Sequence, residues 1–274
     1  MLDIRLIREQ PDIVRDGLRR VGADPVLVEQ VLAFDAARRA LETEVSALRA
    51  QRNAGSKEIG RLKDEAEREA RKAAMRAIGD RIAAIEADLK AAESDQQNLL
   101  LNIPNLPLDE VPYGADEREN VVVKTVGRPR EFDFEPKPHW EIGANLGILD
   151  IERGTKLSGS RFYVLKGQGA ALQRALITFM LDLHTRKHGY TEVYPPAVVK
   201  EHCLVGTGNL PKFGDNLYRD IEDDLWLVPT AEVPVTNLHR EEILDAAQLP
   251  IKYVAYSPCF GRVRMSAGRD VRGI

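Results

Sequence analysis

The chain has 274 residues, which is enough for one large domain or two moderate ones. Its composition, 43% hydrophobic and 30% charged residues, is that of a soluble globular protein, and a net charge of −4 excludes a bulk electrostatic attraction to nucleic acid. The two cysteines, Cys203 and Cys259, have neither metal-ligand nor disulfide-framework spacing. No segment has the length of a signal-peptide core or a membrane helix, so the sequence predicts a cytoplasmic protein with no membrane contact.

Residues 1–103 contain two series of apolar positions with alternating steps of three and four, the spacing of a coiled-coil seam. The first series is Leu27, Val31, Phe34, Leu41, Val45, Leu48, Ile59 and Leu62, and the second is Met75, Ile78, Ile82, Ile85, Leu89, Ala92 and Leu99. The pattern weakens between residues 55 and 70. This spacing predicts two helices of about 35 residues, each about 50 Å long, folded into an antiparallel hairpin.

The expected tip of this hairpin is basic. Residues 49–81 contain ten Lys or Arg and six Asp or Glu, an excess of four positive charges on a chain whose total is negative. One interpretation is a solvated coiled-coil face, which is typical of such charge runs. The other is a functional surface, because a long exposed arm can reach a binding partner.

Residues 104–120 are rich in proline, which cannot continue a helix, and we interpret them as a linker. In residues 121–274 the sequence predicts strands at 121–127, 161–166, 190–194 and 251–260, and an amphipathic helix at 170–188. This irregular alternation favours an α+β fold, with an antiparallel sheet flanked by helices beside the helical hairpin. The sequence contains no GxxxxGK or GxGxxG loop, so neither a P-loop nor a Rossmann site is expected.

Residues 227–240 (LVPTAEVPVTNLHR) give the first candidate site. In a strand, Thr230 and Glu232 would share one face, and a hydroxyl beside a carboxylate suits an α-ammonium ligand. The pattern alone is also typical of a solvated sheet surface.

Six segments, taken together, resemble the seryl-tRNA synthetases of class II: residues 139–150, 156–184, 188–199, 206–213, 227–240 and 249–260. Residues 266–270 (SAGRD) and 272–273 extend the resemblance to the end of the chain. It implies activation of L-serine by ATP and Mg²⁺ and its transfer to tRNA(Ser). It also implies that Thr230 and Glu232 hold the serine ammonium group, and that Pro195 belongs to motif 1 of a homodimer interface. The hairpin would be the arm that binds tRNA, through Arg52, Lys57, Arg61, Arg68 and Arg76.

The sequence departs from the family pattern in motif 2. Gly261 stands where the family has an arginine that neutralises the ATP α-phosphate, and Val263 where it has an adenine-binding glutamate. Arg262 is one residue out of phase with that arginine and is the remaining candidate for an ATP contact. The family's motif 3 is absent from residues 1–274, so the sequence predicts an incomplete form with no intact catalytic set and no normal adenylation.

Three alternatives remain beside a synthetase. A non-catalytic tRNA-binding protein would keep the arm without the chemistry. A carrier-protein ligase related to the catalytic domain would lack the hairpin, and a purely structural coiled coil does not account for residues 139–260. Because the carboxylate of serine is itself the nucleophile, no catalytic histidine is required, and the five histidines are interpreted as structural, with no metal ligands expected. They are His139, His184, His188, His202 and His239.

Overall fold

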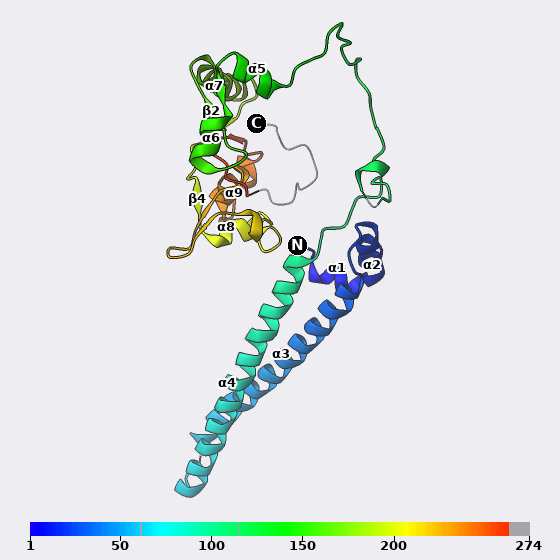
Figure 1. Ribbon diagram of the computed structural model, residues 1–274. Helices are drawn as coiled ribbons and strands as arrows, with labels where there is room; N and C mark the ends of the chain where they lie inside the picture. Colours follow the sequence, from blue (N-terminus) through cyan, green and yellow to red (C-terminus); the bar gives the residue numbers. More distant parts are fainter. Residues whose placement is uncertain (61, 115, 263–274) are drawn as a thin grey trace. The chain divides into compact units, whose positions relative to one another are not determined.

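The computed structural model describes residues 1–60, 62–114 and 116–262. The chain divides into two compact parts: an N-terminal unit, Met1–Thr125, and a C-terminal unit, Val126–Ile274. Both are visible in Figure 1, and each is described by itself. The N-terminal unit is helical, with α1 at Ile4–Glu9, α2 at Pro11–Arg20, α3 at Val26–Ile59, α4 at Glu65–Asn102 and the short 3₁₀ helix η1 at Glu117–Glu119.

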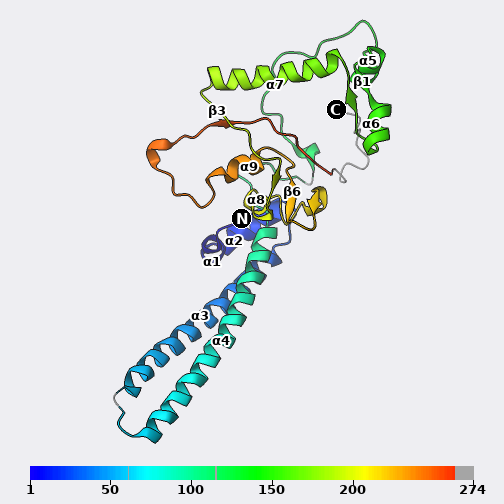
Figure 2. The same cartoon turned by 90° about the vertical axis from the view of Figure 1, so that its left-hand side faces the viewer.

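Helices α3 and α4, of 34 and 38 residues, form the predicted antiparallel hairpin, here called the arm. They run side by side in both Figure 1 and Figure 2. Val45, Ile82 and Ile85 lie buried in the seam between them, as the apolar spacing predicted. α4 begins at Glu65 because Asp64 caps it: the Asp64 carboxylate accepts a hydrogen bond from the backbone N–H of Glu67 at 2.9 Å.

The base of the arm holds the larger core of this unit. Its buried residues come from α1, α2, α3 and the end of α4: Ile7, Val14, Leu18, Val28, Val31, Leu100 and Ile103. Gly17 on α2 allows the close approach of Leu106, because a Cβ on residue 17 would lie only 2.6 Å from Leu106 Cδ2. The start of the proline-rich segment is therefore packed onto the helices.

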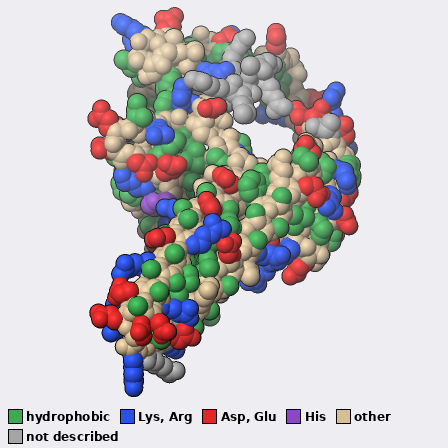
Figure 3. Space-filling view, turned by 90° about the horizontal axis from the view of Figure 1, so that it is seen from below, with side chains coloured by type: hydrophobic (Ala, Val, Ile, Leu, Met, Phe, Trp, Pro, Cys, Tyr) green, Lys and Arg blue, Asp and Glu red, His purple; other side chains and the backbone are tan. Residues whose placement is uncertain are grey.

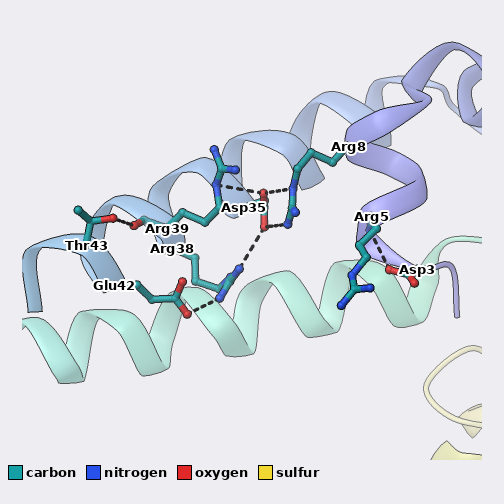
Figure 4. Close-up of polar contacts among 8 residues, drawn as sticks. All are labelled: Asp3, Arg5, Arg8, Asp35, Arg38, Arg39, Glu42 and Thr43. Atoms are coloured by element: carbon teal, nitrogen blue, oxygen red, sulfur yellow. Dashed lines mark hydrogen bonds and ion pairs between the residues drawn. The ribbon is translucent and has the colours of Figure 1, made fainter. Parts of the chain in front are cut away.

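A buried carboxylate joins α1 to the arm (Figure 4). Asp35 on α3 accepts two hydrogen bonds from the Arg8 guanidinium, at 2.9 and 3.0 Å, and one from Arg38 at 3.3 Å. Arg39 also lies 3.6 Å away. Burial raises the pKa of Asp35, but the hydrogen bonds from Arg8 and Arg38 outweigh it and hold the pKa below its ordinary value. Asp35 is thus a charged anchor for α1.

Residues 103–114 form no helix or strand, in keeping with their prolines, and Arg20 Nη2 donates to the carbonyls of Leu108 and Val111 at 3.2 and 2.7 Å. The strand predicted at residues 121–127 is wrong. These residues form no strand, and Val123 is 95% exposed. A run of β-branched residues favours a strand only where a neighbouring strand can pair with it, and this segment has none among the described residues.

The C-terminal unit is built from short elements. Its helices are α5 (His139–Asn145), α6 (Ile151–Ser158), α7 (Gln168–Lys187), α8 (Glu201–Gly206), η2 (Gly214–Asn216), α9 (Glu232–Thr236), η3 (Asn237–His239) and η4 (Ala246–Gln248). Its strands are β1 (Leu149–Asp150), β2 (Val164–Leu165), β3 (Thr191–Glu192), β4 (Val198–Val199), β5 (Arg219–Asp220), β6 (Leu225–Leu227) and β7 (Tyr253–Val254).

These strands pair in three small sheets. β1 and β2 are antiparallel, and so are the neighbours in the order β4-β6-β5. β3 and β7 form a parallel pair with Thr191 opposite Tyr253. The predicted strands at 161–166, 190–194 and 251–260 exist only as two-residue pairs at their centres. The predicted α+β class, with a helical hairpin in one unit and a sheet region with helices in the other, is confirmed.

The core of the C-terminal unit lies around β6 and α8. Its buried residues are Val199, Leu204, Leu210, Leu217, Trp226, Val228 and Val233. By contrast α7, predicted at residues 170–188 and found at Gln168–Lys187, leaves its large apolar side chains exposed, including Leu172, Leu176, Phe179 and Met180. The helix is confirmed, but its apolar face is uncovered in the described chain.

Candidate functional site

Three segments far apart in the sequence meet at the backbone of Val228. The Val228 N–H donates to the carbonyl of Ala197 at 3.0 Å, and the Phe260 N–H donates to the carbonyl of Val228 at 2.8 Å. Val228 itself is fully buried. Pro195, Thr230 and Gly261 each lie within two residues of one of these three residues, so the junction gathers three of the predicted site positions.

Thr230 and Glu232 lie side by side, but not on a strand. β6 ends at Leu227, and Glu232 is the first residue of α9. The predicted strand through residue 232 is wrong, because Pro229 has no N–H to donate to a sheet and interrupts the ladder. The Thr230 hydroxyl instead donates to the Glu232 carboxylate across the bend.

This contact changes the electrostatics of the pair. The hydrogen bond from Thr230, followed by a backbone hydrogen bond at Glu232 itself, lowers the pKa of Glu232 from its ordinary value. Glu232 is exposed and therefore ionised and accessible at neutral pH. An ionised carboxylate beside a hydroxyl is a suitable receptor for an ammonium group.

The segment that follows Glu232 is held on two sides. The Asn237 side-chain amide donates to the carbonyls of Cys203 and Val233, at 3.0 and 2.8 Å. His239 Nε2 lies 3.0 Å from the Tyr253 hydroxyl, and its Nδ1 lies 2.7 Å from a Glu242 carboxylate oxygen. Sequence reasoning treated His239 as structural, which fits this role, but it gave no signal for its partner Tyr253.

A cavity of about 170 Å³ lies beside the last described residues. Its lining is mostly aromatic and apolar: Phe162, Tyr218, Leu227, Cys259, Phe260 and Gly261. Gly261 thus faces a space that suits a flat ring, and it brings no charge to it.

Arg262, the candidate for an ATP contact, lies against Tyr218, one of the residues that line this cavity. Its backbone N–H donates to the carbonyl of Asn216 at 2.9 Å, and its guanidinium lies 5.5 Å from the centre of the Tyr218 ring. Val263 lies outside the described residues, as do residues 266–270. Among the described residues, no group of three or more His, Cys, Asp or Glu side chains could hold a metal ion.

Comparison with known proteins shows which proteins this chain resembles. Residues 1–107 match the family model for the seryl-tRNA synthetase N-terminal domain. Two relatives named serine–tRNA ligase, from Roseiflexus sp. (strain RS-1) and Herpetosiphon aurantiacus, are 65% and 59% identical over all 274 residues. The chain is therefore similar over its whole length to serine–tRNA ligases, and its residues 1–107 carry the N-terminal domain of the seryl-tRNA synthetases. It spans 64% and 65% of the length of these two relatives.

Solved structures of the same family support the match. The chain aligns over its whole length with a seryl-tRNA synthetase from Pyrococcus horikoshii complexed with ATP, with a TM-score of 0.88, 34% identity and 66% of that chain covered. A cytoplasmic serine–tRNA ligase from Naegleria fowleri in complex with AMP gives a TM-score of 0.81 at 28% identity, with 67% of that chain covered.

The basic residues near the tip of the arm fall into two groups. One group forms ion pairs along the arm: Arg49 with Glu86, Arg71 with Glu58, Lys72 with Glu69 and Arg81 with Glu44. The other group makes no ion pair with any residue that the structure describes, and it contains four of the predicted tRNA contacts, Arg52, Lys57, Arg68 and Arg76. The fifth, Arg61, lies outside the described residues.

The arm surface carries both signs of charge. Figure 3, viewed from below, shows Lys and Arg side chains interspersed with Asp and Glu over the arm. On this face the basic side chains are separate and do not form one continuous patch. Pro195, the predicted motif 1 residue, is buried between β3 and β4, whereas several apolar side chains on α7 are exposed.

Proposed function

We propose that this chain carries the serine-binding and tRNA-binding parts of a serine–tRNA ligase, which activates L-serine with ATP and transfers it to tRNA(Ser). The observation that carries the proposal is the junction at Val228, which gathers Thr230, Pro195 and Gly261. We propose the predicted domain organisation: residues 1–103 are the helical tRNA-binding domain that contains the arm, 104–120 are the linker and 121–274 are the catalytic part.

In the proposed reaction, Glu232 and Thr230 hold the serine ammonium group and orient its carboxylate. A carboxylate oxygen attacks the α-phosphorus of ATP, the bond from that phosphorus to the bridging oxygen breaks, and pyrophosphate leaves. The cavity beside Phe260 would take the adenine ring. Mg²⁺ would enter as a companion of the ATP phosphates, since the described residues offer no carboxylate cluster for it.

A second function, tRNA binding without chemistry, is favoured by one observation. Gly261 offers no charge to the α-phosphate, and the Arg262 guanidinium lies over the Tyr218 ring. Loss of one preorganised charge at a developing oxyanion costs about 10²–10³ in rate. Any adenylation by this chain should therefore be slow.

Serine-dependent exchange of pyrophosphate into ATP separates these two functions. If the chain is a ligase, exchange is detectable, and Glu232→Gln raises the KM for serine because the ammonium loses its counter-charge. Glu222→Gln, an equal charge change at an exposed turn residue, is the control and should leave KM unchanged. Absence of serine-dependent exchange in the unmodified chain would overturn the ligase proposal, and retained tRNA binding would then support the second function.

The proposed contact with tRNA(Ser) depends on the basic side chains of the arm that form no ion pair with the residues that the structure describes. Changing Arg52, Lys57, Arg68 and Arg76 together to Gln should weaken binding strongly and reduce its salt dependence, because each phosphate contact releases counterions. The control changes Arg49, Arg71, Lys72 and Arg81 to Gln, which removes the same charge from the same arm. If both quadruple variants bind equally, only net charge matters and the residue assignment is wrong.

We further propose that the protein is a cytoplasmic homodimer. None of the described helices is apolar over a length that would cross a membrane. The apolar side chains exposed on α7 supply the self-complementary surface, and Phe179, 63% exposed, is the largest. Phe179→Glu should shift sedimentation to monomer, whereas Leu157→Glu, at an exposed leucine on α6, should not. A dimer that survives Phe179→Glu would place the interface elsewhere.

A further inference from the structure

Two histidines face each other at the end of α7. His184 and His188 are four residues apart, one helical turn, so their side chains lie on the same side of the helix. Their Nδ1 atoms are 3.1 Å apart and their ring centres 5.0 Å apart. In the metal-free protein, one Nδ1–H donates to the lone pair of the other.

The backbone beneath this pair is fixed. The N–H groups of His188 and Tyr190 both donate to the carbonyl of His184, at 3.3 and 3.1 Å. Gly189, with φ +70°, provides the left-handed turn that ends the helix. The chain then enters β3, where the Thr191 N–H donates to the carbonyl of Lys252 at 2.9 Å. Both histidines thus lie at a helix C-terminus whose backbone is fixed by hydrogen bonds.

The rings are also restrained. The Tyr190 ring packs edge-on to His184, with 5.4 Å between the ring centres. Two cationic side chains of the neighbouring segments have other contacts: Arg186 pairs with Asp182 at 3.2 Å, and the Lys252 ammonium lies 5.9 Å from the Tyr190 ring centre. The carbonyl end of a helix favours a cation, because the aligned peptide dipoles leave partial negative charge there.

This separation of nitrogens matches chelation. Two metal–nitrogen bonds of about 2.0–2.1 Å to atoms 3.1 Å apart enclose an angle of about 100°, which lies between the octahedral and tetrahedral values. Rotations about the Cβ–Cγ bonds, which are soft for histidine, would turn both ring nitrogens from each other toward one ion. Imidazole nitrogen is a preferred ligand of Zn²⁺, Cu²⁺ and Ni²⁺.

We propose that His184 and His188 form a bidentate site for a divalent first-row transition-metal ion such as Zn²⁺, Cu²⁺ or Ni²⁺. With two protein donors, water fills the remaining positions, so the site lies open at the surface. A bound ion replaces the N–H···N hydrogen bond and ties the last turn of α7 to its own C-cap. The site is independent of serine and ATP, and it assigns a role to two histidines that sequence reasoning treated as structural.

The test is calorimetric titration of the untagged 274-residue chain with Ni²⁺, which is less thiophilic than Zn²⁺ and so avoids Cys203 and Cys259. One ion per chain is expected. His184→Ala and His188→Ala should each weaken binding at least about tenfold, because one of two ligands is lost. His139→Ala, at an exposed histidine beside Trp140, is the matched control and should bind Ni²⁺ like the unmodified chain.

A second measurement separates ligand loss from unfolding. Ni²⁺ should raise the thermal midpoint followed by tryptophan fluorescence in the unmodified chain, and by less in His184→Gln, whose metal-free midpoint shows whether it is folded. The proposal is overturned if the folded His184 and His188 variants bind Ni²⁺ as tightly as the unmodified chain. It is equally overturned if His139→Ala weakens binding as much as they do.

Discussion

The two units of this chain treat their apolar side chains in opposite ways. In the N-terminal unit, α3 and α4 cover each other, and Ile85 in their seam is 1% exposed. In the C-terminal unit, α7 is nearly as apolar in pattern, yet Phe179 and its neighbours face outward. The arm thus finds its packing partner one hairpin turn away in sequence, while α7 finds none in the described chain.

The two units are also stabilised by contacts of different range in the sequence. Hairpin contacts are local and close at little cost in chain entropy, whereas pairings such as β3 with β7 join residues about sixty positions apart. Both tryptophans, Trp140 and Trp226, lie in the C-terminal unit, and the longest helices lie in the N-terminal unit. Tryptophan fluorescence therefore follows one unit, and circular dichroism at 222 nm follows mainly the other.

The largest predicted effect comes from a matched pair of core truncations, Leu204→Ala and Ile85→Ala. Each side chain is almost fully buried, so each change should lower the free energy of unfolding by about 2–5 kcal/mol. Leu204→Ala should shift the fluorescence transition in urea and leave the dichroism transition in place. Ile85→Ala should do the reverse. If either variant shifts both transitions equally, the units unfold together and the comparison fails.

A smaller effect is expected where α6 meets β2. Gly154 on α6 packs against the backbone of Phe162 and Tyr163, just before β2. A Cβ on residue 154 would lie 2.4 Å from the Phe162 carbonyl oxygen and from Tyr163 Cα. Backbone cannot rotate away as a side chain can, so Gly154→Ala should cost about 1–3 kcal/mol in the fluorescence transition.

Gly55→Ala is the control for that change. Gly55 is also a buried helical glycine, but its added Cβ would meet the thioether of Met75, at 2.4 Å from Sδ. A flexible methionine can shift, so this change in the arm should cost less. A larger loss for Gly55→Ala than for Gly154→Ala would contradict the packing argument.

The sequence predicted the N-terminal unit well, because its signal is repeated. Between Leu41 and Ile85, apolar residues spaced by three and four mark the buried face of each helix. This spacing predicts both helices and the turn between them. The same reasoning located α7 to within two residues at its start, since a helix is set by its own sequence even where its face is uncovered.

The C-terminal unit was predicted less well, for physical reasons. Val121–Val123 have strand composition but pair with no strand in the part of the chain that the structure describes, and Pro229 breaks the expected strand before Thr230. The neighbourhood of Thr230 and Glu232 was still foreseen, since a bend can bring two side chains together as a strand can. The pairing of Tyr253 with His239 depends on β7 returning beside η3, which no local pattern encodes.

Removal of the buried carboxylate should have a moderate effect on the N-terminal unit alone. Asp35→Asn keeps the shape but loses the ion pairs with Arg8 and Arg38, and because Arg8 is partly exposed the cost should be about 1–2 kcal/mol. The dichroism transition reports it. Because the pKa of Asp35 is lowered on folding, its contribution is complete above the ordinary carboxyl pKa and disappears as pH falls through the folded value.

The smallest effect is the corresponding acid response of the C-terminal unit. Asp150 caps α6: the Arg153 backbone N–H, the Arg153 guanidinium and the Lys166 ammonium donate to it at 3.0, 2.6 and 3.0 Å and hold its pKa well below the ordinary value. Its contribution is therefore complete above about pH 4 and declines below it. Asn is as good an N-cap as Asp, so Asp150→Asn should flatten the acid side of the fluorescence midpoint against pH while leaving the helix capped. The dichroism midpoint of the same samples is the internal control: if it flattens equally, the response belongs to the whole chain and the two units are not separate in acid.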